Sequence, residues 1–304
     1  MNYTKQLITI LGPTATGKTR LAALLAAHLN GEVISADSRQ VYRGMNLGTG
    51  KDFDDYIIEG QLVKYHLVDI AEPGTEYNLF SFIRDFIDAF NGITSQGKLP
   101  ILCGGTGLYL DAVLSRYRMT LVPEQTPIRS ELEKKSNNQL SHMLSTHRPL
   151  HNTTDLTDRC RLIRAVEIAE YEALHPEAIL TMPAFYNRVF GINCSRMEVR
   201  SRITRRLQQR IKQGMIEEVS DLMKLGLTPD QLDFYGLEYR YITRYLTGAI
   251  DHDEMFESLN TAIHQFAKRQ ITWFRKMQRS GISIEWIDGS LSQEERLRVI
   301  LSLL

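Results

Sequence analysis

A glycine-rich run near the N-terminus has the residue types and the spacing that bind a diphosphate. Residues 12–19 read GPTATGKT and fit the pattern G-x-x-x-x-G-K-[ST]. In such a loop the glycines let backbone N–H groups curl around phosphate oxygens, and the helix that follows adds the positive end of its dipole. The lysine reaches a terminal phosphate oxygen, and the hydroxyl after it binds Mg²⁺. We therefore assign the metal to Thr19 and diphosphate binding to Gly12, Pro13, Thr14, Ala15, Thr16, Gly17, Lys18 and Thr19.

The rest of the sequence gives little support for nucleotide hydrolysis. The loop is typical of nucleotide-binding and ATP-binding proteins, but those that hydrolyse ATP usually carry a second strand that ends in Asp or Asp-Glu. Here the strand-like run ILCGG ends in glycines. Asp69, at the end of YHLVD, could bind a metal but is as consistent with a turn at a strand end. The loop therefore predicts diphosphate recognition and leaves the reaction open.

Asp37 is the candidate general base. It ends the apolar run EVISAD, one connection after the phosphate loop. A carboxylate beside a phosphate site disfavours anion binding unless it binds Mg²⁺ or accepts a proton. A turn or N-cap role is the alternative, since Ser38 adjoins it. A third loop, GGTG at 104–107, follows another apolar run, and its glycines would allow close approach of a ligand that the Thr106 hydroxyl could face.

Two helical stretches near the C-terminus carry stripes of basic residues. One stripe recurs every four residues and comprises Arg202, Arg206 and Arg210. The other shares one face of a long helix and comprises Lys268, Arg275 and Arg279, with Arg269 and Trp273 adjacent. Such stripes suit the phosphate backbone of a nucleic acid, and a solvated helix face is the alternative. The apolar residues of the same helix are expected in the core: Ile263, Phe266, Ile271 and Phe274.

The elements that must position these residues read as an α/β fold. Apolar runs at 7–11, 32–36, 63–70 and 99–103 alternate with helical spacing, which predicts a parallel sheet with flanking helices around the P-loop. Ligands of such a sheet bind beyond the carboxyl ends of the strands, where the three polar loops fall. We expect residues 1–118 to form the first part of this core, 119–195 a mostly helical insertion, and 196–304 the rest of the core with the basic helices.

The composition excludes several classes of protein. The 304 residues are 43% hydrophobic and 24% charged, which is typical of a globular chain and not of a disordered one. Lys and Arg number 36, as do Asp and Glu, so a nucleic-acid partner would need a local basic patch. The cysteines form no CxxC pair, which disfavours zinc and disulfides. Because no apolar run approaches ~20 residues and no signal peptide is visible, we expect a cytoplasmic protein with no membrane partner.

Six segments follow one another in a specific order: GPTATGKT, ADSRQVYRGMNLGTGK, GGTGLYL, RCRLIRAVEIAE, LEYR and AKRQITWFRK. Together they resemble the tRNA dimethylallyltransferases, enzymes that prenylate the adenosine 3′ of the anticodon. The resemblance extends over nearly the whole chain and implies a P-loop core with a helical insertion. That family usually reads GMDIGTAKP where this chain has Asn46, Gly50 and Asp52.

The resemblance also implies a reaction and the residues that perform it. A dimethylallyl group would pass from dimethylallyl diphosphate to the exocyclic N6 amine of that adenosine, with Mg²⁺ as cofactor and the tRNA anticodon stem-loop as partner. The catalytic residues would be Asp37 as base, with Lys18, Thr19 and Arg206 acting on the leaving diphosphate. The insertion would contact tRNA, and the protein would be a monomer. Contacts to tRNA would come from Asp37, Ser38, Arg39, Gln40, Thr106, Arg129, Arg161, Arg164, Arg240, Lys268, Arg269, Gln270 and Arg275.

Three other functions share parts of this sequence pattern. An adenylate isopentenyltransferase, which acts on free nucleotides, would share the phosphate loop and Asp37 but would not need basic helices. A P-loop small-molecule kinase would bind ATP beside an acceptor pocket. A non-enzymatic ATP switch that binds RNA would need the hydrolytic acid pair that the sequence lacks.

Overall fold

The computed structural model describes residues 5–123, 128–147, 156 and 158–304. The chain divides into two compact units. The main unit consists of Met1–Arg116 and Pro183–Leu304, and the insertion unit consists of Tyr117–Met182.

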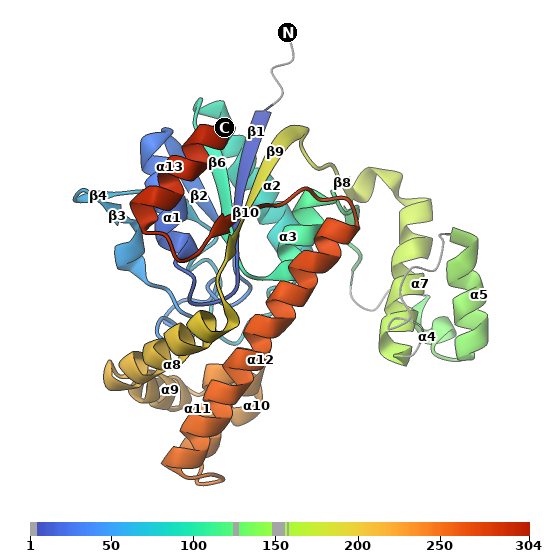
Figure 1. The fold of residues 1–304 in the computed structure, drawn as a ribbon. Coiled ribbons are helices and arrows are strands. Elements are labelled where there is room, and N and C mark those ends of the chain that lie inside the picture. The colour runs from blue at the N-terminus through green and yellow to red at the C-terminus, as the bar shows by residue number, and fades with distance from the viewer. Residues whose placement is uncertain (1–4, 124–127, 148–155, 157) are drawn as a thin grey trace. The chain divides into compact units, whose positions relative to one another are not determined.

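A six-stranded sheet forms the centre of the main unit, with the strand order β10-β9-β1-β6-β2-β5 (Figure 1). Every neighbouring pair is parallel, as the sequence predicts. The strands are β1 (Lys5–Leu11), β2 (Gly31–Ala36), β5 (Tyr65–His66), β6 (Leu99–Gly104), β9 (Phe185–Asn193) and β10 (Glu285–Asp288). All carboxyl ends therefore meet at one edge, where the phosphate loop follows β1, Asp37 follows β2 and the GGTG turn includes the end of β6.

Helices cover both faces of this sheet (Figure 1). On one face, α1 (Lys18–His28) and α13 (Gln293–Leu303) share a buried core with alternate residues of β1, Ile8 and Ile10. The other face carries α2 (Leu79–Ser95) and α3 (Gly107–Leu114). There the rings of Phe86 and Phe90 pack 6.5 and 5.4 Å from that of Phe185. A 3₁₀ turn and a small hairpin lie between β2 and β5: Phe53–Tyr56, β3 (Ile57–Ile58) and β4 (Gln61–Leu62).

The rest of the main unit is helical. It comprises α8 (Arg196–Lys212), α9 (Met215–Lys224), α10 (Pro229–Phe234), α11 (Leu237–Leu246) and α12 (His252–Arg279). These helices share one buried cluster, in which Ile203, Val219 and Leu259 pack with Tyr42 and Met45 from the segment after β2. The loop that carries the sequence VYRGMNLGTGK is therefore anchored in this helical core, which places it beside α8.

The insertion unit has its own small core. Its short strands β7 (Met119–Thr120) and β8 (Ile179–Leu180) pair antiparallel, and Pro176–Ala178 form a 3₁₀ turn. Its helices include α4 (Arg129–Leu132), α5 (Asn137–His147) and α7 (Arg159–Leu174). The buried side chains that hold them together include Leu132, Leu140, Leu162 and Val166. The expected mostly helical character of this segment is thus present among its described residues.

The predicted end of the insertion, residue 195, is wrong. The nine residues of β9 lie inside the range expected for the insertion, yet β9 pairs with β1 from Lys5–Phe185 to Leu11–Gly191. This pairing joins segments about 180 positions apart along the chain, so local sequence patterns carry no sign of it. The C-terminal piece ISIEWID does add a strand, β10, as expected. Among the helices that the structure describes, none is long and apolar enough to cross a membrane.

Candidate active site

The phosphate loop joins β1 to α1 in a tight turn. Gly17, at the N-cap of α1, has φ 76°, and Ala15 has φ 63°, so both adopt the left-handed conformation. The buried hydroxyl of Thr16 donates a 2.8 Å hydrogen bond to the carbonyl of Pro13 and closes the turn from inside. The N-terminus of α1, with the positive end of its dipole, therefore lies at the loop as the motif predicts.

Gln270 on α12 braces the phosphate loop against the GGTG turn. Its amide oxygen accepts from the backbone N–H of Thr14 at 2.9 Å, and its amide nitrogen donates to the carbonyl of Gly105 at 2.8 Å. The side chain is buried, and both ends of its amide are engaged inside the protein. The structure thus gives Gln270 a role in positioning two loops, and the expected contact with tRNA stays a prediction.

Helix α13 braces the same loop from the other side. Arg296 donates to the carbonyl of Thr16 at 2.9 Å, and Gln293 donates to that of Gly17 at 3.0 Å. Arg296 is 3% exposed, although it carries a charge. A buried guanidinium that binds backbone carbonyls holds their geometry firmly, because its desolvation is compensated only while those bonds persist. No local sequence pattern had indicated this contribution of the C-terminal helix.

A cavity of about 1340 Å³ opens over the carboxyl edge of the sheet. Most of the predicted site residues of the main unit line it: Thr14, Ala15, Thr16, Gly17, Lys18, Thr19, Asp37, Ser38, Arg39, Gln40, Thr106, Arg206, Arg240, Arg269 and Gln270. Gly12 and Pro13 belong to the loop beneath, and Lys268 and Arg275 lie on exposed positions of α12. The three loops that the sequence assigned to one edge therefore share one cavity.

Lys18 contributes its ammonium to this cavity. Burial lowers its pKa, and the nearby Asp37 acts in the opposite direction. A bound anion would stabilise the charged form of such a lysine, which burial disfavours. The position of Lys18 thus fits the binding of a terminal phosphate oxygen.

The position of Asp37 is compatible with both of the roles that the sequence left open. Its Oδ1 accepts from the backbone N–H of Arg39 at 3.0 Å, which is the turn role. The same residue lines the cavity with Lys18, which is the position required of a base. The Thr106 hydroxyl accepts from the N–H of Ser38 at 3.1 Å and fixes the segment that follows Asp37. Thr106 therefore positions the Asp37 loop in addition to lining the cavity.

The glycines of the GGTG turn serve packing inside the protein. A Cβ at Gly104 would lie 2.2 Å from the carbonyl oxygen of Ala36. A Cβ at Gly105 would lie 2.5 Å from Gln270 Nε2, and one at Gly107 would lie 2.4 Å from Trp273 Cγ. Gly104 thus packs against β2, whereas Gly105 and Gly107 pack against α12 and also line the cavity, so the expected close approach of a ligand at these two glycines stays a prediction.

Arg206, the arginine assigned to the leaving diphosphate, reaches the cavity from α8. Its guanidinium lies 2.7 Å from the carboxylate of Asp52, and the neighbouring Arg210 lies 3.0 Å from the same carboxylate. Burial and the adjacent Arg210 lower the pKa of Arg206. The first basic stripe is therefore turned inward: Arg206 and Arg210 bind Asp52, and Arg202 binds Glu198 and the carbonyl of Gly289.

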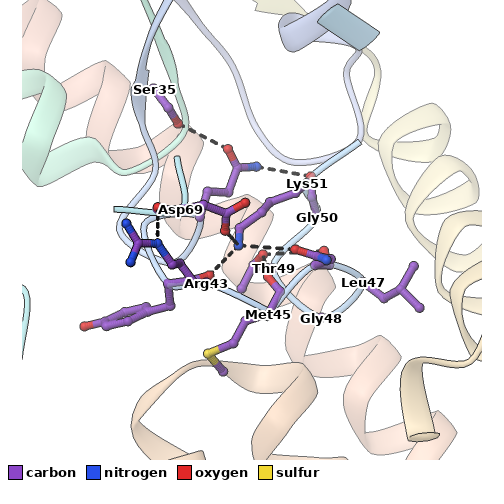
Figure 2. A network of polar contacts seen from close by, with 12 residues as sticks. Ser35, Arg43, Met45, Leu47, Gly48, Thr49, Gly50, Lys51 and Asp69 are labelled. Carbon is purple, nitrogen blue, oxygen red and sulfur yellow. Dashed lines mark hydrogen bonds and ion pairs between the residues drawn. The ribbon is translucent and has the colours of Figure 1, made fainter. Parts of the chain in front are cut away.

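The segment that follows Asp37 is held in place by the buried side chain of Lys51 (Figure 2). Lys51 forms an ion pair with Asp69 and contacts the side chain of Asn46 at 3.4 Å. The carbonyl of Asp69 accepts from Arg43 at 2.8 Å. Because Asp69 is engaged in this way and does not line the cavity, its turn interpretation is supported over the metal interpretation.

Two glutamates that the sequence pattern does not single out also shape the site. Glu218 on α9 accepts from the backbone N–H groups of three successive residues, 46–48, at 2.8–3.0 Å and from the hydroxyl of Tyr239 at 2.7 Å. It therefore anchors the loop that carries Gly50 and Asp52. Glu238, within the LEYR segment, lines the cavity, and burial raises its pKa. The residues around each of these glutamates are distant in sequence, so local spacing does not predict their roles.

Helix α12 presents part of its apolar spacing to the cavity. Phe266 is 39% exposed and lines the cavity, so its expected place in the core is wrong. Arg269 lies over the Phe266 ring, 6.0 Å from its centroid. Ile263 and Phe274 are buried as expected. Among the basic residues of this helix, Arg269 therefore lines the cavity beside an aromatic ring.

The predicted tRNA-binding arginines of the insertion unit differ in their surroundings. Arg129 and Arg164 lie 3.3 and 3.0 Å from the buried carboxylate of Glu167. Arg164 also donates to the carbonyl of Val122 at 2.8 Å. Arg161 is 62% exposed and pairs with Asp158 at 3.4 Å. Arg161 is thus the most exposed of the three side chains.

Comparison with known proteins finds family models and relatives that match most of the chain. The family model "IPP transferase" matches residues 40–277, and the model "Isopentenyl transferase" matches residues 5–63. The chain is 53% identical over 294 residues to a "tRNA dimethylallyltransferase 2" of Bacteroides fragilis, covering 97% of this chain and 96% of the relative. It is 50% identical over 298 residues to a protein of the same name from Phocaeicola vulgatus, covering 98% and 97%.

A solved structure shows the same architecture. The full-length tRNA isopentenylpyrophosphate transferase from Bacillus halodurans superposes with a TM-score of 0.72 at 31% identity, covering 98% of this chain and 95% of the other. The fold is therefore the P-loop fold of these enzymes, as the sequence predicts. The match of the family model over most of the chain and the identity to full-length relatives lead to one conclusion: the chain belongs to the IPP transferase family.

Proposed function

We propose that the protein transfers a dimethylallyl group from dimethylallyl diphosphate to the N6 amine of the adenosine 3′ of the anticodon in tRNA, and releases diphosphate. The observation that carries this proposal is the shared cavity of Asp37, Lys18 and Arg206. It brings a carboxylate base and two cations to one space at the end of a phosphate loop. The names of the relatives, tRNA dimethylallyltransferase, supply the donor and the class of acceptor.

In this mechanism the chain positions two reactants and neutralises charge. The adenine nitrogen attacks the first carbon of the dimethylallyl group, a C–N bond forms, and the C–O bond to diphosphate breaks with its electron pair leaving on oxygen. Asp37 accepts the proton that the amine loses. Lys18, Arg206 and the N–H groups of the phosphate loop stabilise the charge that develops on the diphosphate.

Magnesium fits this cavity as a companion of the diphosphate. Among the described residues no group of three or more His, Cys, Asp or Glu side chains could hold a metal ion. Mg²⁺ commonly binds through substrate phosphates, water and one or two protein oxygens. The hydroxyl of Thr19, which lines the cavity, would provide an oxygen donor of that type. When bound, the ion would add positive charge at the leaving diphosphate.

Recognition of the RNA is proposed to use the mouth of the cavity and the exposed face of α12. Arg39, Arg240 and Arg269 line the cavity beside aromatic rings, and Lys268 and Arg275 extend the basic surface along α12. The target base leaves its stack to reach Asp37, which costs less in an anticodon loop than in a duplex. We propose that Arg161 of the insertion unit adds a further contact, and that the protein acts as a monomer in the cytoplasm.

One experiment tests the proposal against its rivals. Purified protein is incubated with Mg²⁺, labelled dimethylallyl diphosphate and either bulk tRNA, AMP, or ATP with candidate acceptors. We expect label and a mass gain of one five-carbon unit on tRNA alone. Label on AMP would support an adenylate isopentenyltransferase, and phosphate transfer from ATP would support a kinase. Either result without prenylated tRNA would overturn the proposal.

A further inference from the structure

Asp52 binds both arginines that α8 presents to the cavity. Its Oδ2 lies 2.7 Å from Arg206 Nη2, and its Oδ1 lies 3.0 Å from Arg210 Nη2. The Asp52 side chain is 48% exposed, whereas that of Arg210 is 10% exposed. One carboxylate thus spans two guanidiniums, which is the arrangement that an oxyanion would adopt there. It does so inside the cavity that holds Lys18.

The backbone is shaped to bring Asp52 to this position. Gly50 has φ 81°, and a Cβ there would lie 2.9 Å from Arg206 Nη2, so only glycine allows this close approach. The carbonyl of Gly50 accepts from Arg206 at 3.3 Å and from the amide of Gln40 at 3.1 Å. The segment is anchored further back by Glu218. The ordered turn at Gly50 therefore positions Asp52 for its contact with Arg206.

A second carboxylate lines the cavity close to Asp52. It belongs to Asp55, and burial together with the charge of Asp52 raises the pKa of Asp55. An incoming diphosphate therefore meets Asp52 as a repelling charge and as a competitor for Arg206. Arg206 is 29% exposed and can exchange partners, whereas the more buried Arg210 keeps the carboxylate.

We propose that Asp52 is an internal competitor for Arg206 that limits the affinity of the cavity for diphosphate and so favours release of the diphosphate product. Diphosphate takes over Arg206 when it binds, and Asp52 recovers Arg206 when diphosphate leaves. This inference rests on the proposed function, since it assumes that the cavity binds diphosphate. It makes Asp52 a positioning residue that acts through Arg206. The alternative interpretation is that Asp52 is a brace, which holds the guanidinium of Arg206 in the position in which it binds diphosphate.

The two interpretations predict opposite changes in affinity. Asp52→Asn keeps the size of the side chain and an oxygen for the arginines but removes the charge. If Asp52 competes with the ligand, inorganic diphosphate with Mg²⁺ will bind about tenfold more tightly to this variant. If Asp52 is a brace, diphosphate will bind more weakly. Isothermal titration calorimetry of the full chain with inorganic diphosphate measures the difference directly.

Asp54→Asn is the matched control, because it removes the same charge two residues away on an exposed side chain that does not line the cavity. We expect it to bind diphosphate like the unchanged protein. Asp52→Ser serves as a second variant, and its thermal unfolding is compared with that of the unchanged protein. Inhibition of prenyl transfer by added diphosphate should strengthen in both Asp52 variants, by a factor similar to the gain in affinity.

The outcomes separate this inference from the proposed function. Equal or weaker diphosphate binding by folded Asp52 variants, in a protein that prenylates tRNA, overturns the inference alone. Tighter binding by the variants without any prenylation of tRNA supports the inference and overturns the proposed acceptor. Failure of the unchanged protein to bind diphosphate overturns both.

Discussion

The amide oxygen of Gln270 lies 2.9 Å from the backbone nitrogen of Thr14, and this contact joins the last long helix to the phosphate loop. The same side chain reaches Gly105 in the neighbouring turn. Any movement of α12 is therefore transmitted to the loop that would hold the diphosphate. The geometry links the helix whose outer face is basic with the loop whose inner face binds an anion.

Replacing Gln270 by Leu should destabilise the protein and weaken diphosphate binding. The change leaves the buried carbonyl of Gly105 unpaired and removes the partner of the half-buried N–H of Thr14, which together costs about 2–4 kcal/mol. Urea unfolding monitored by circular dichroism measures the loss. Lys268→Leu on the exposed face of the same helix is the control, with an expected change within about 0.5 kcal/mol. Equal stability of the two variants would contradict the bracing role.

Asp37→Asn should separate the turn from the chemistry. The amide oxygen of Asn can still accept from the N–H of Arg39, so the loop and its stability should be retained. The base is lost, and transfer to tRNA should fall by about 10²–10⁴-fold. Single-turnover transfer and a thermal melt are measured on the same preparation. Turnover near that of the unchanged protein would remove Asp37 from the mechanism.

Replacing Lys268, Arg269 and Arg275 together by Gln should weaken tRNA binding. All three are exposed on α12, and for every phosphate that is no longer neutralised the slope of log affinity against log salt falls by about 0.7–0.9. Affinity for dimethylallyl diphosphate should hardly change. Filter binding at several salt concentrations gives the slope, with Arg298→Gln on exposed α13 as the control for a single charge. An unchanged slope would mean that the stripe is only a solvated face.

The phosphate loop should prefer dimethylallyl diphosphate to ATP. With Mg²⁺, the preferred ligand should raise the melting temperature, because it binds the folded chain alone. ATP should compete weakly and release no phosphate at a catalytic rate, since Asp69 is held by Lys51 and lies outside the cavity. Thermal shift and phosphate-release assays, with and without tRNA, check both points. Steady tRNA-stimulated hydrolysis of ATP without prenylated RNA would contradict this expectation.

Glu32 should make the stability of the main unit depend on acid pH. Burial alone would raise its pKa, but hydrogen bonds from two lysines and a histidine outweigh this effect and lower the pKa to about 2. The three lie at 2.6, 2.7 and 3.2 Å: Lys98, His66 and Lys64. Because the pKa is lower in the folded state, the stabilisation is complete above the ordinary pKa of a glutamate. It is lost as the pH falls from about 4.5 towards 2.

The size of this effect is at most about 3 kcal/mol, and exposure of Lys64 to solvent reduces it. Glu32→Gln removes the titrating group while keeping its shape. The free energy of unfolding of the two proteins should therefore differ most near pH 6 and converge towards pH 2. A difference that stays constant over this range would show that Glu32 does not titrate as inferred.

Much of the central sheet could be predicted, because its strands and the turns after them have local signatures. The short apolar run of β1 and the motif that follows it predicted both the strand and the edge at which ligands bind. Strand β9 could not be found in this way, since its nine residues are flanked by the polar, proline-bearing stretch that resembles the insertion. Its place beside β1 depends on contacts between distant segments, and a single sequence does not display them.

The same distinction holds within the site. Residues of the phosphate loop and Asp37 were predicted because their chemistry is tied to local spacing. The partners of Arg206 were not, since helical spacing shows that arginines share a face but not that the face is turned towards Asp52. Phe266 was placed in the core on spacing alone, whereas the cavity interrupts the core at that position. The role of a charged residue such as Glu218, which binds a segment more than 100 residues away, cannot be predicted from local spacing.

The hydrogen bonds of Arg296 and Gln293 to the phosphate loop span 280 and 276 positions of the chain. On the ribosome, the N-terminal loop emerges long before the helix that supports its carbonyls. A chain that stops before α13 would carry the complete GPTATGKT motif and the strand in front of it, yet the back of the loop would have no support. We therefore expect such a truncated chain to bind diphosphate more weakly than the full chain.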